Sequence, residues 1–131
     1  MLRSSSVLLL LGLAGCVGPE IPEMVSGEWG GVHLGLVASE AGADLEFDCA
    51  SGRITGAVRP DGNGRFSVSG TQTPGGGPIG FGEGAESRAA RYDGTVRGDR
   101  MTITVTLTDT NEILGTFTLF RGASPHVFKC L

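Results

Sequence analysis

The chain has 131 residues, of which 23 are glycine, and its 14 acidic against 10 basic residues give a net charge of −4. This length fits one domain and excludes a multi-domain enzyme. The acidic balance, without clustered lysine or arginine, excludes an ordinary nucleic-acid-binding protein. Glycine is this frequent in collagen and in disordered chains, but there is no Gly-X-Y period and 40% of the residues are hydrophobic. A folded, glycine-rich domain is therefore expected.

The N-terminal segment has the features of an export signal. Arg3 supplies a positive charge, and the apolar run 7–13 is far shorter than the roughly 20 residues that a membrane-spanning helix needs. The Leu-Ala-Gly-Cys sequence at 13–16 resembles the lipobox of bacterial lipoproteins. The resemblance implies cleavage after Gly15 and a diacylglycerol on Cys16. The alternative is an ordinary signal peptide followed by a coincidental cysteine.

Cleavage at this site divides the chain into a signal peptide (1–15), a lipidated tether (16–26) and a folded domain (27–131). Removal of 15 of the 131 residues leaves 116, with a side-chain charge of −5 because Arg3 is lost. Val17 stands where aspartate retains the lipoproteins of enteric bacteria in the inner membrane. The expected location is therefore the outer membrane, facing the periplasm, with the membrane as a partner through the lipid.

The cysteine count agrees with export. Three cysteines leave one thiol unpaired in an oxidising compartment. If Cys16 carries the lipid, Cys49 and Cys130 remain as a pair. A disulfide that closes about 80 residues contributes about 4–5 kcal/mol in the chain-entropy model. Two unpaired thiols are the alternative.

Alternation of apolar and polar residues predicts β-strands along the first half of the domain. The expected strands here are 29–38, 44–49, 53–59 and 66–70. A turn at residues 51–52 pairs Phe47 with Gly56 and places the apolar residues of both strands on one face. Within the first strand, His33 faces away from the apolar set.

A long irregular segment follows, at residues 71–87. It is rich in glycine and proline, and loops of this length in a compact domain are usually functional or disordered. Ile79 and Phe81 are candidates to cover a barrel mouth or to insert into a partner. The alternative is a solvated, flexible connection.

The second half of the domain again alternates. The expected strands are 91–97, 101–108, 113–119 and 127–130. The Gly-Asp pair at 98–99 suits a type II′ turn and pairs Tyr92 with Val105. Eight sequential strands with one apolar face predict an all-β, antiparallel up-and-down barrel, which buries that face and removes the sheet edges. A two-layer β-sandwich is the alternative. A membrane-spanning barrel is not expected, because the outward residues are polar and charged.

The Gly-Glu-Trp sequence at 27–29 resembles the Gly-X-Trp motif of lipocalin-type barrels. The resemblance implies that Trp29 packs across the closed end of the barrel and that a late arginine, Arg121, stacks on it. The chain is shorter than a typical lipocalin and lacks an evident terminal helix, so the resemblance is to a small lipocalin-like (calycin-like) barrel. The whole pattern is also similar to small exported lipoproteins of Gram-negative bacteria.

Two polar groupings are candidate sites. If residues 40–43 form a turn, Gly35 faces Asp48 and His33 lies diagonal to that carboxylate. A metal site needs three or four converging ligands, so a surface histidine is expected rather than a metal centre. Alternate acidic residues over 44–48 form a stripe flanked across the hairpin by arginines 53 and 59. Cross-strand ion pairs on a solvated, convex face are the expected role of this stripe.

The inferred interior is apolar, and no Ser-His-Asp or Cys-His set is credible, so a non-enzymatic protein without cofactor or metal is expected. The leading hypothesis is a binding or accessory module of the cell envelope that holds a small apolar ligand or a protein partner. The candidate binding residues are Trp29, Tyr92, Arg121, Ile79 and Phe81. The alternatives are a periplasmic inhibitor of lysozyme or of a protease, and a purely structural envelope protein.

Overall fold

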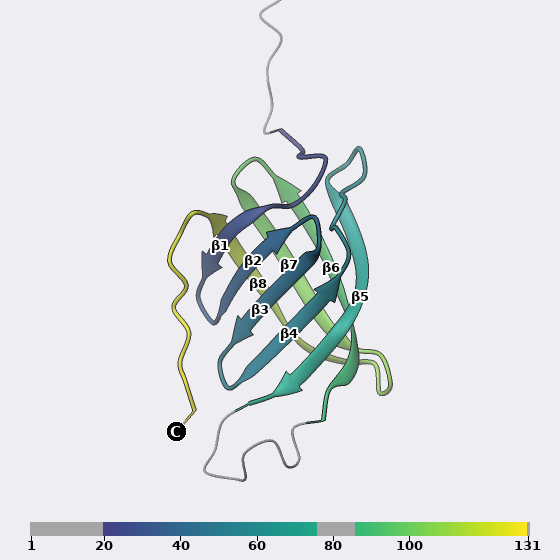
Figure 1. Cartoon of the computed structure of the whole chain (residues 1–131), viewed down its shortest axis with the longest axis vertical. Coiled ribbons are helices and arrows are strands. Elements are labelled where there is room, and N and C mark those ends of the chain that lie inside the picture. Colours follow the sequence, from purple (N-terminus) through teal and green to yellow (C-terminus); the bar gives the residue numbers. More distant parts are fainter. Residues whose placement is uncertain (1–19, 76–85, 131) are drawn as a thin grey trace, which may run out of the picture.

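The computed structural model describes residues 20–75 and 86–130 and is all-β (Figure 1). Eight antiparallel strands form a closed barrel in chain order, which confirms the predicted up-and-down topology. The strands are β1 (Gly27–Gly31), β2 (Leu34–Ser39), β3 (Gly42–Phe47), β4 (Ala50–Thr55), β5 (Arg65–Pro74), β6 (Arg88–Arg97), β7 (Arg100–Leu107) and β8 (Glu112–Arg121). Each strand pairs with its successor, and β1 pairs with β8 to close the barrel.

The single strand predicted over 29–38 is in fact the hairpin of β1 and β2. The chain reverses at residues 32–33, so that Trp29 lies opposite Leu36. His33 has a φ of 71°, which is uncommon for a residue other than glycine. Its backbone N–H donates to the His126 carbonyl at 2.8 Å. The turn lacks the glycine, asparagine or aspartate that usually marks a reversal, so alternation continued through it in the sequence.

The register predicted for the β3–β4 hairpin is wrong. The turn lies at residues 48–49 rather than 51–52, and Phe47 pairs with Ala50 instead of Gly56. Cys49 takes a φ of 57° in this turn and forms a disulfide with a distant part of the chain. The shift in register is an even number of residues, so each side chain keeps its predicted face. Gly52, which looked like a turn residue, is a strand residue instead.

The β6–β7 hairpin has the predicted register. Tyr92 lies opposite Val105, and Arg97 lies opposite Arg100 at the turn. The expected loop at 71–87 is shorter than predicted, because β5 continues to Pro74 and β6 begins at Arg88.

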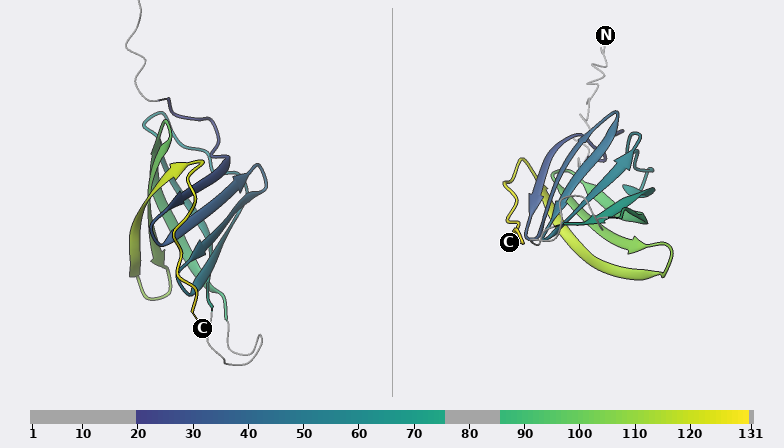
Figure 2. Two further views of the ribbon diagram at one scale, coloured as in Figure 1. Left: turned by 90° about the vertical axis from the view of Figure 1, so that its left-hand side faces the viewer. Right: turned by 60° about the horizontal axis from the view of Figure 1, so that its bottom comes forward.

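The C-terminal residues 127–130, predicted as a strand, are not one. The chain beyond β8 instead runs along the outside of β1 and β2 (Figure 2). His126 forms an isolated parallel bridge with Val32. Gly30 and Gly35 lie opposite each other, and a Cβ on Gly35 would come within 2.9 Å of Pro125. Because Gly30 and Gly35 carry no side chains, the C-terminal segment can pack closely against the outer wall. The eight strands were predicted correctly in number, but one expected range is two strands and another is none.

Candidate functional site

The inside of the barrel is filled by its own side chains. The buried hydrophobic residues form one cluster: Val25, Trp29, Leu34, Leu36, Ala38, Ala43, Leu45, Phe47, Ile54, Val58, Phe66, Ala90, Tyr92, Val96, Met101, Ile103, Val105, Leu107 and Leu119. Each is at most 8% exposed. An eight-stranded barrel is just wide enough for side chains to fill it in this way. A partner therefore has access to the outside of the described barrel rather than to its interior.

Trp29 and Arg121 meet where the barrel closes. They lie opposite each other on β1 and β8, and the Arg121 guanidinium carbon is 5.5 Å from the Trp29 ring centroid. The indole N–H of Trp29 donates to the Ser26 carbonyl at 3.0 Å. The contact expected from the Gly-X-Trp motif is thus present. Trp29 is 1% exposed, so this pair closes the barrel end rather than forming an open surface.

Tyr92 is the polar point of the interior. Its hydroxyl has two hydrogen-bond acceptors, the Thr71 carbonyl at 2.6 Å and Gln72 Oε1 at 2.7 Å, and shares its proton between them. Burial raises the pKa of the Tyr92 phenol well above its ordinary value. Gln72 is itself buried, although the sequence placed it in a loop. The phenol is a satisfied core group, with no access to solvent.

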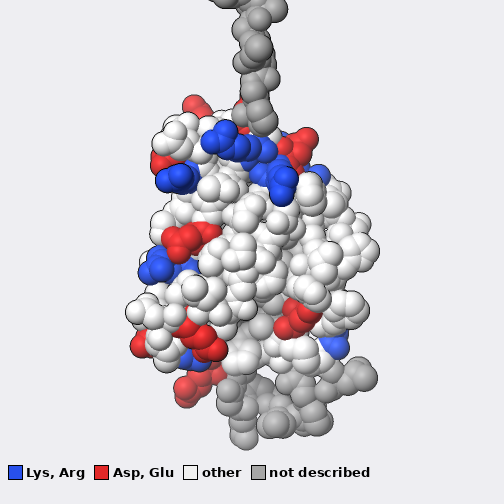
Figure 3. Space-filling model, turned by 180° about the vertical axis from the view of Figure 1, so that it is seen from behind, with Lys and Arg blue, Asp and Glu red and all other residues white. Residues whose placement is uncertain are grey.

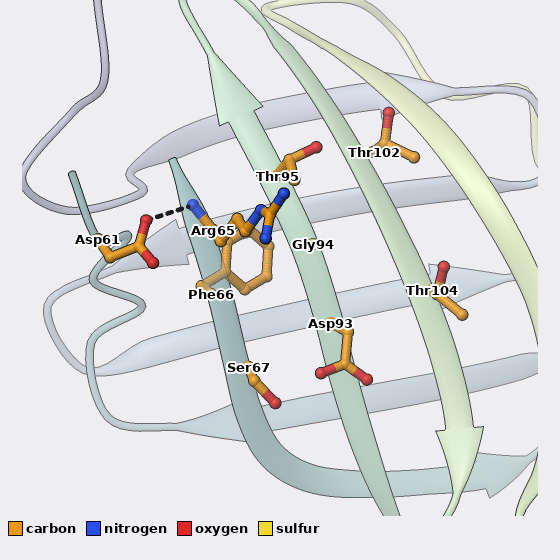
Figure 4. Close-up of a pocket in the computed structure, with 9 residues that line it drawn as sticks. All are labelled: Asp61, Arg65, Phe66, Ser67, Asp93, Gly94, Thr95, Thr102 and Thr104. Carbon is orange, nitrogen blue, oxygen red and sulfur yellow. Dashed lines mark hydrogen bonds between the residues drawn. The ribbon is translucent and has the colours of Figure 1, made fainter. Parts of the chain in front are cut away.

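The outer wall over β5, β6 and β7 carries a groove of about 470 Å³ (Figure 4). It is lined by Asp61, Arg65, Phe66, Ser67, Asp93, Gly94, Thr95, Thr102 and Thr104. The strand register orders the outward polar residues into two rows. The first row runs Arg65, Thr95, Thr102 across the three strands. The second row lies next to the first, two residues away on each strand, and runs Ser67, Asp93, Thr104.

The two carboxylates of the groove stay ionised. Partial burial raises the pKa of Asp93, but hydrogen bonds from Ser67 and Arg91 outweigh that effect, and its net pKa lies below the ordinary value. The Arg91 Nε lies 2.8 Å from the Asp93 carboxylate. Asp61 Oδ1 accepts backbone N–H bonds from Arg65 at 3.0 Å and Asn63 at 2.8 Å, and these bonds lower its pKa. The groove therefore offers fixed acceptors beside hydroxyl groups and one guanidinium.

Sequence reasoning missed this groove, because it expected the polar faces to be convex. The predicted β6–β7 register already implied that Asp93 pairs with Thr104 and Thr95 with Thr102. What the sequence did not supply was the register of β5, whose partner lies across the long connection to β6. Phe66, whose side chain belongs to the interior cluster, also lines the groove where β5 pairs with β6.

The polar groupings predicted near His33 are structural. The Asp48 carboxylate forms a hydrogen bond with Nδ1 of the His33 ring, and it also accepts a hydrogen bond from the backbone N–H of Phe128 at 2.7 Å. The expectation that Gly35 faces Asp48 is wrong, since Gly35 lies opposite Glu46. At the other end of the acidic stripe, Asp44 pairs with Arg53 at 3.0 Å across the β3–β4 hairpin, as expected. Arg59 lies beyond the end of β4, so it does not flank the stripe.

The predicted disulfide between Cys49 and Cys130 is present, with 5.0 Å between the two Cα atoms. It fixes the end of the C-terminal segment to the β3–β4 turn. Cys16, Ile79 and Phe81 lie outside the described residues, so the lipidation and loop predictions stay predictions.

Within residues 20–75 and 86–130, no three side chains of histidine, cysteine, aspartate or glutamate gather closely enough to hold a metal ion. The same residues contain no helix that is long and apolar enough to cross a membrane. Comparison with known proteins gives no match to any family model, to any curated protein or to any solved structure.

Proposed function

We propose that this protein is a lipid-anchored, non-enzymatic binding module of the Gram-negative cell envelope. In this proposal the Leu-Ala-Gly-Cys sequence directs acylation of Cys16, and the domain is held on the outer membrane, facing the periplasm. A relationship to lipocalin-like barrels is supported by the packing of Arg121 on Trp29.

The observation that carries the binding role is the contrast between a filled interior and a polar groove on the outer wall. Interior side chains occupy the space that a small apolar ligand would need. The groove instead combines two carboxylates, four hydroxyl groups and the Arg65 guanidinium. Carboxylates accept, guanidinium groups donate, and serine and threonine hydroxyls do both. This set matches a ligand that is rich in hydroxyl groups, and we propose a glycan chain.

The anchor is tested by metabolic labelling with an alkyne-bearing fatty acid in a bacterial host. The wild-type chain is expected to incorporate the label and to fractionate with membranes. The Cys16→Ser chain is expected to remain unlabelled. A labelled Cys16→Ser chain, or an unlabelled wild type, contradicts the anchor.

The groove is tested by titration calorimetry of the full-length, detergent-solubilised protein with soluble oligomers of N-acetylglucosamine and of glucose. Asp93→Asn is expected to weaken binding about 10- to 100-fold, because it removes a charged hydrogen-bond acceptor. Asp44→Asn is the matched control, since Asp44 also pairs with an arginine on the outer wall but lies away from the groove. Equal effects of the two substitutions, or no heat with either oligomer, would count against a glycan site.

A further inference from the structure

The arginine residues of the barrel fall into two groups by their partners. Three form ion pairs with aspartate: Arg53 with Asp44 at 3.0 Å, Arg88 with Asp109 at 2.9 Å, and Arg91 with Asp93 at 2.8 Å. The other five have no carboxylate of the described residues within 4.0 Å. We call these the tether-end arginines: Arg59, Arg65, Arg97, Arg100 and Arg121. All five are exposed.

The tether-end arginines lie at the end of the barrel where the chain enters the described structure. The Glu20 carbonyl accepts the Gly98 N–H at 2.7 Å, which places the first described residue on the β6–β7 turn. Arg97 and Arg100 flank that turn, and the Arg121 N–H donates to the Asp99 carbonyl at 2.8 Å. Figure 3 shows basic side chains gathered at this end of the barrel, with acidic side chains among them.

Of the remaining two, Arg59 lies in the connection between β4 and β5, and Arg65 begins β5. Hydrogen bonds hold this connection at the same end of the barrel. The Val25 N–H donates to the Val58 carbonyl at 2.9 Å, beside Arg59. The Val96 N–H donates to the Gly64 carbonyl at 2.8 Å, beside Arg65. One barrel end thus gathers five guanidinium groups from three separate parts of the chain.

Arg97 and Arg100 face each other directly across the hairpin. Like charges at directly opposed positions destabilise a sheet. A bound anion between them relieves that repulsion, and guanidinium groups bind phosphate oxygens through two parallel hydrogen bonds.

We propose that the tether end of the barrel docks on the headgroups of anionic phospholipids. This inference rests on the lipid anchor of the proposed function. Only three residues lie between Cys16 and Glu20, and the four Cα-to-Cα steps that join them span at most about 14 Å when fully extended. The anchor therefore holds the tether-end arginines close to the bilayer, at a distance comparable to the Debye length of about 8–10 Å.

Six carboxylates are also present at this end, at Glu20, Glu23, Glu28, Glu40, Asp61 and Asp99, so its acidic residues outnumber the five arginines by one. The Asp61 carboxylate stabilises the local turn, because it accepts hydrogen bonds from two backbone N–H groups there. The attraction consequently depends on projecting, unpaired guanidinium groups rather than on net charge. Docking directs the opposite end of the barrel, with the β7–β8 turn, away from the membrane and leaves the groove on the side wall accessible.

The test uses the full-length acylated protein in vesicles of phosphatidylcholine, with or without phosphatidylglycerol. Trp29, the only tryptophan, lies at the docking end and serves as the energy donor to a dansyl-labelled lipid headgroup. Wild type is expected to show greater transfer with phosphatidylglycerol, and added salt is expected to remove the increase. The double variant R97Q/R100Q is expected to lower the ratio of docked to undocked protein about thirtyfold.

The matched control is R53Q/R88Q, which removes the same charge from two paired arginines elsewhere on the barrel. It is expected to keep the increase. Equal transfer in both vesicle types, or an equal loss in both double variants, would overturn docking. Sedimentation with vesicles of phosphatidylcholine alone reports the anchor separately, because that surface offers no anionic headgroup. Failure to sediment with phosphatidylcholine vesicles would contradict the anchor. The difference between R97Q/R100Q and R53Q/R88Q on anionic vesicles tests docking separately.

Discussion

Arg121 lies over the ring of Trp29 at the closure of the barrel, 5.5 Å from the ring centroid. These residues also face each other in the backbone pairing between β1 and β8, which extends over only two positions. Every other pair of neighbouring strands is paired over at least five positions. The side-chain contact therefore reinforces the shortest strand pairing of the barrel.

Replacement of Arg121 by alanine is expected to lower the free energy of unfolding by about 0.5–2 kcal/mol, because the cation–π contact and the cover over Trp29 are lost. Arg100→Ala is the control, and it is expected to change stability by less than about 0.5 kcal/mol. Urea denaturation followed by Trp29 fluorescence measures both variants. Equal stabilities for the two variants would show that the contact contributes nothing to closure.

Removal of the Tyr92 hydroxyl in Tyr92→Phe is expected to cost about 1–3 kcal/mol. The substitution leaves the buried Gln72 side chain and the Thr71 carbonyl without this hydrogen-bond donor. The loss is expected to be smaller in Tyr92→Phe/Gln72→Leu, because both polar partners are then replaced by apolar groups. Urea denaturation of the single and double variants measures this difference, and an equally stable Tyr92→Phe chain would contradict the network.

The same phenol predicts a dependence of stability on pH. Burial raises the pKa of Tyr92 in the folded chain, whereas the unfolded chain titrates near pH 10. The folded state therefore keeps the proton to higher pH, so the stability from this group is complete below about pH 10. Above that pH it falls by about 1.4 kcal/mol per pH unit. Tyr92 is the only tyrosine, so tyrosinate absorbance reports the titration directly. Tyr92→Phe is expected to lack this part of the alkaline loss.

A methyl group at Gly52 is expected to destabilise the barrel by about 1–3 kcal/mol, because its Cβ would overlap the Tyr92 hydroxyl inside the wall. Gly62→Ala is the control, since a Cβ there meets nothing within 4 Å. Thermal unfolding of the two variants measures the difference. Similar melting temperatures would argue that the interior has room to adjust.

Loss of the disulfide through Cys49→Ser/Cys130→Ser is expected to cost about 4–5 kcal/mol, since the bond closes a separation of 81 residues. The C-terminal segment is expected to become sensitive to protease first, because it is held to the wall by few other contacts. Limited proteolysis with mass spectrometry measures this effect. A C-terminus that stays protected in the double variant would assign the segment's position to its packing on Gly30 and Gly35.

The local sequence was sufficient where a strand pair is joined by a recognisable short turn. The Gly-Asp pair at 98–99 and the alternation on either side of it fixed the pairing of Tyr92 with Val105. The same logic failed at residues 48–49 and 32–33, where Cys49 and His33 take positive φ values. Contacts from the distant C-terminal segment hold both turns, and such contacts leave no local signal.

The sequence by itself determined the inward face of most strand residues, because alternation with a period of two survives an even shift in register. Ile113 is an exception: the alternation of β8 places it inward, but it is 65% exposed because a bulge shifts the pairing of β7 with β8 by one residue. The sequence also determined the partner of Cys49, because only one other cysteine of the domain was available. Only the tertiary structure decided the groove on the outer wall and the grouping of the five unpaired arginines. The groove depends on the pairing of β5 with β6 across the connection between them. The grouping of the arginines depends on hydrogen bonds that join the chain entry, the β4–β5 connection, the β6–β7 turn and the end of β8.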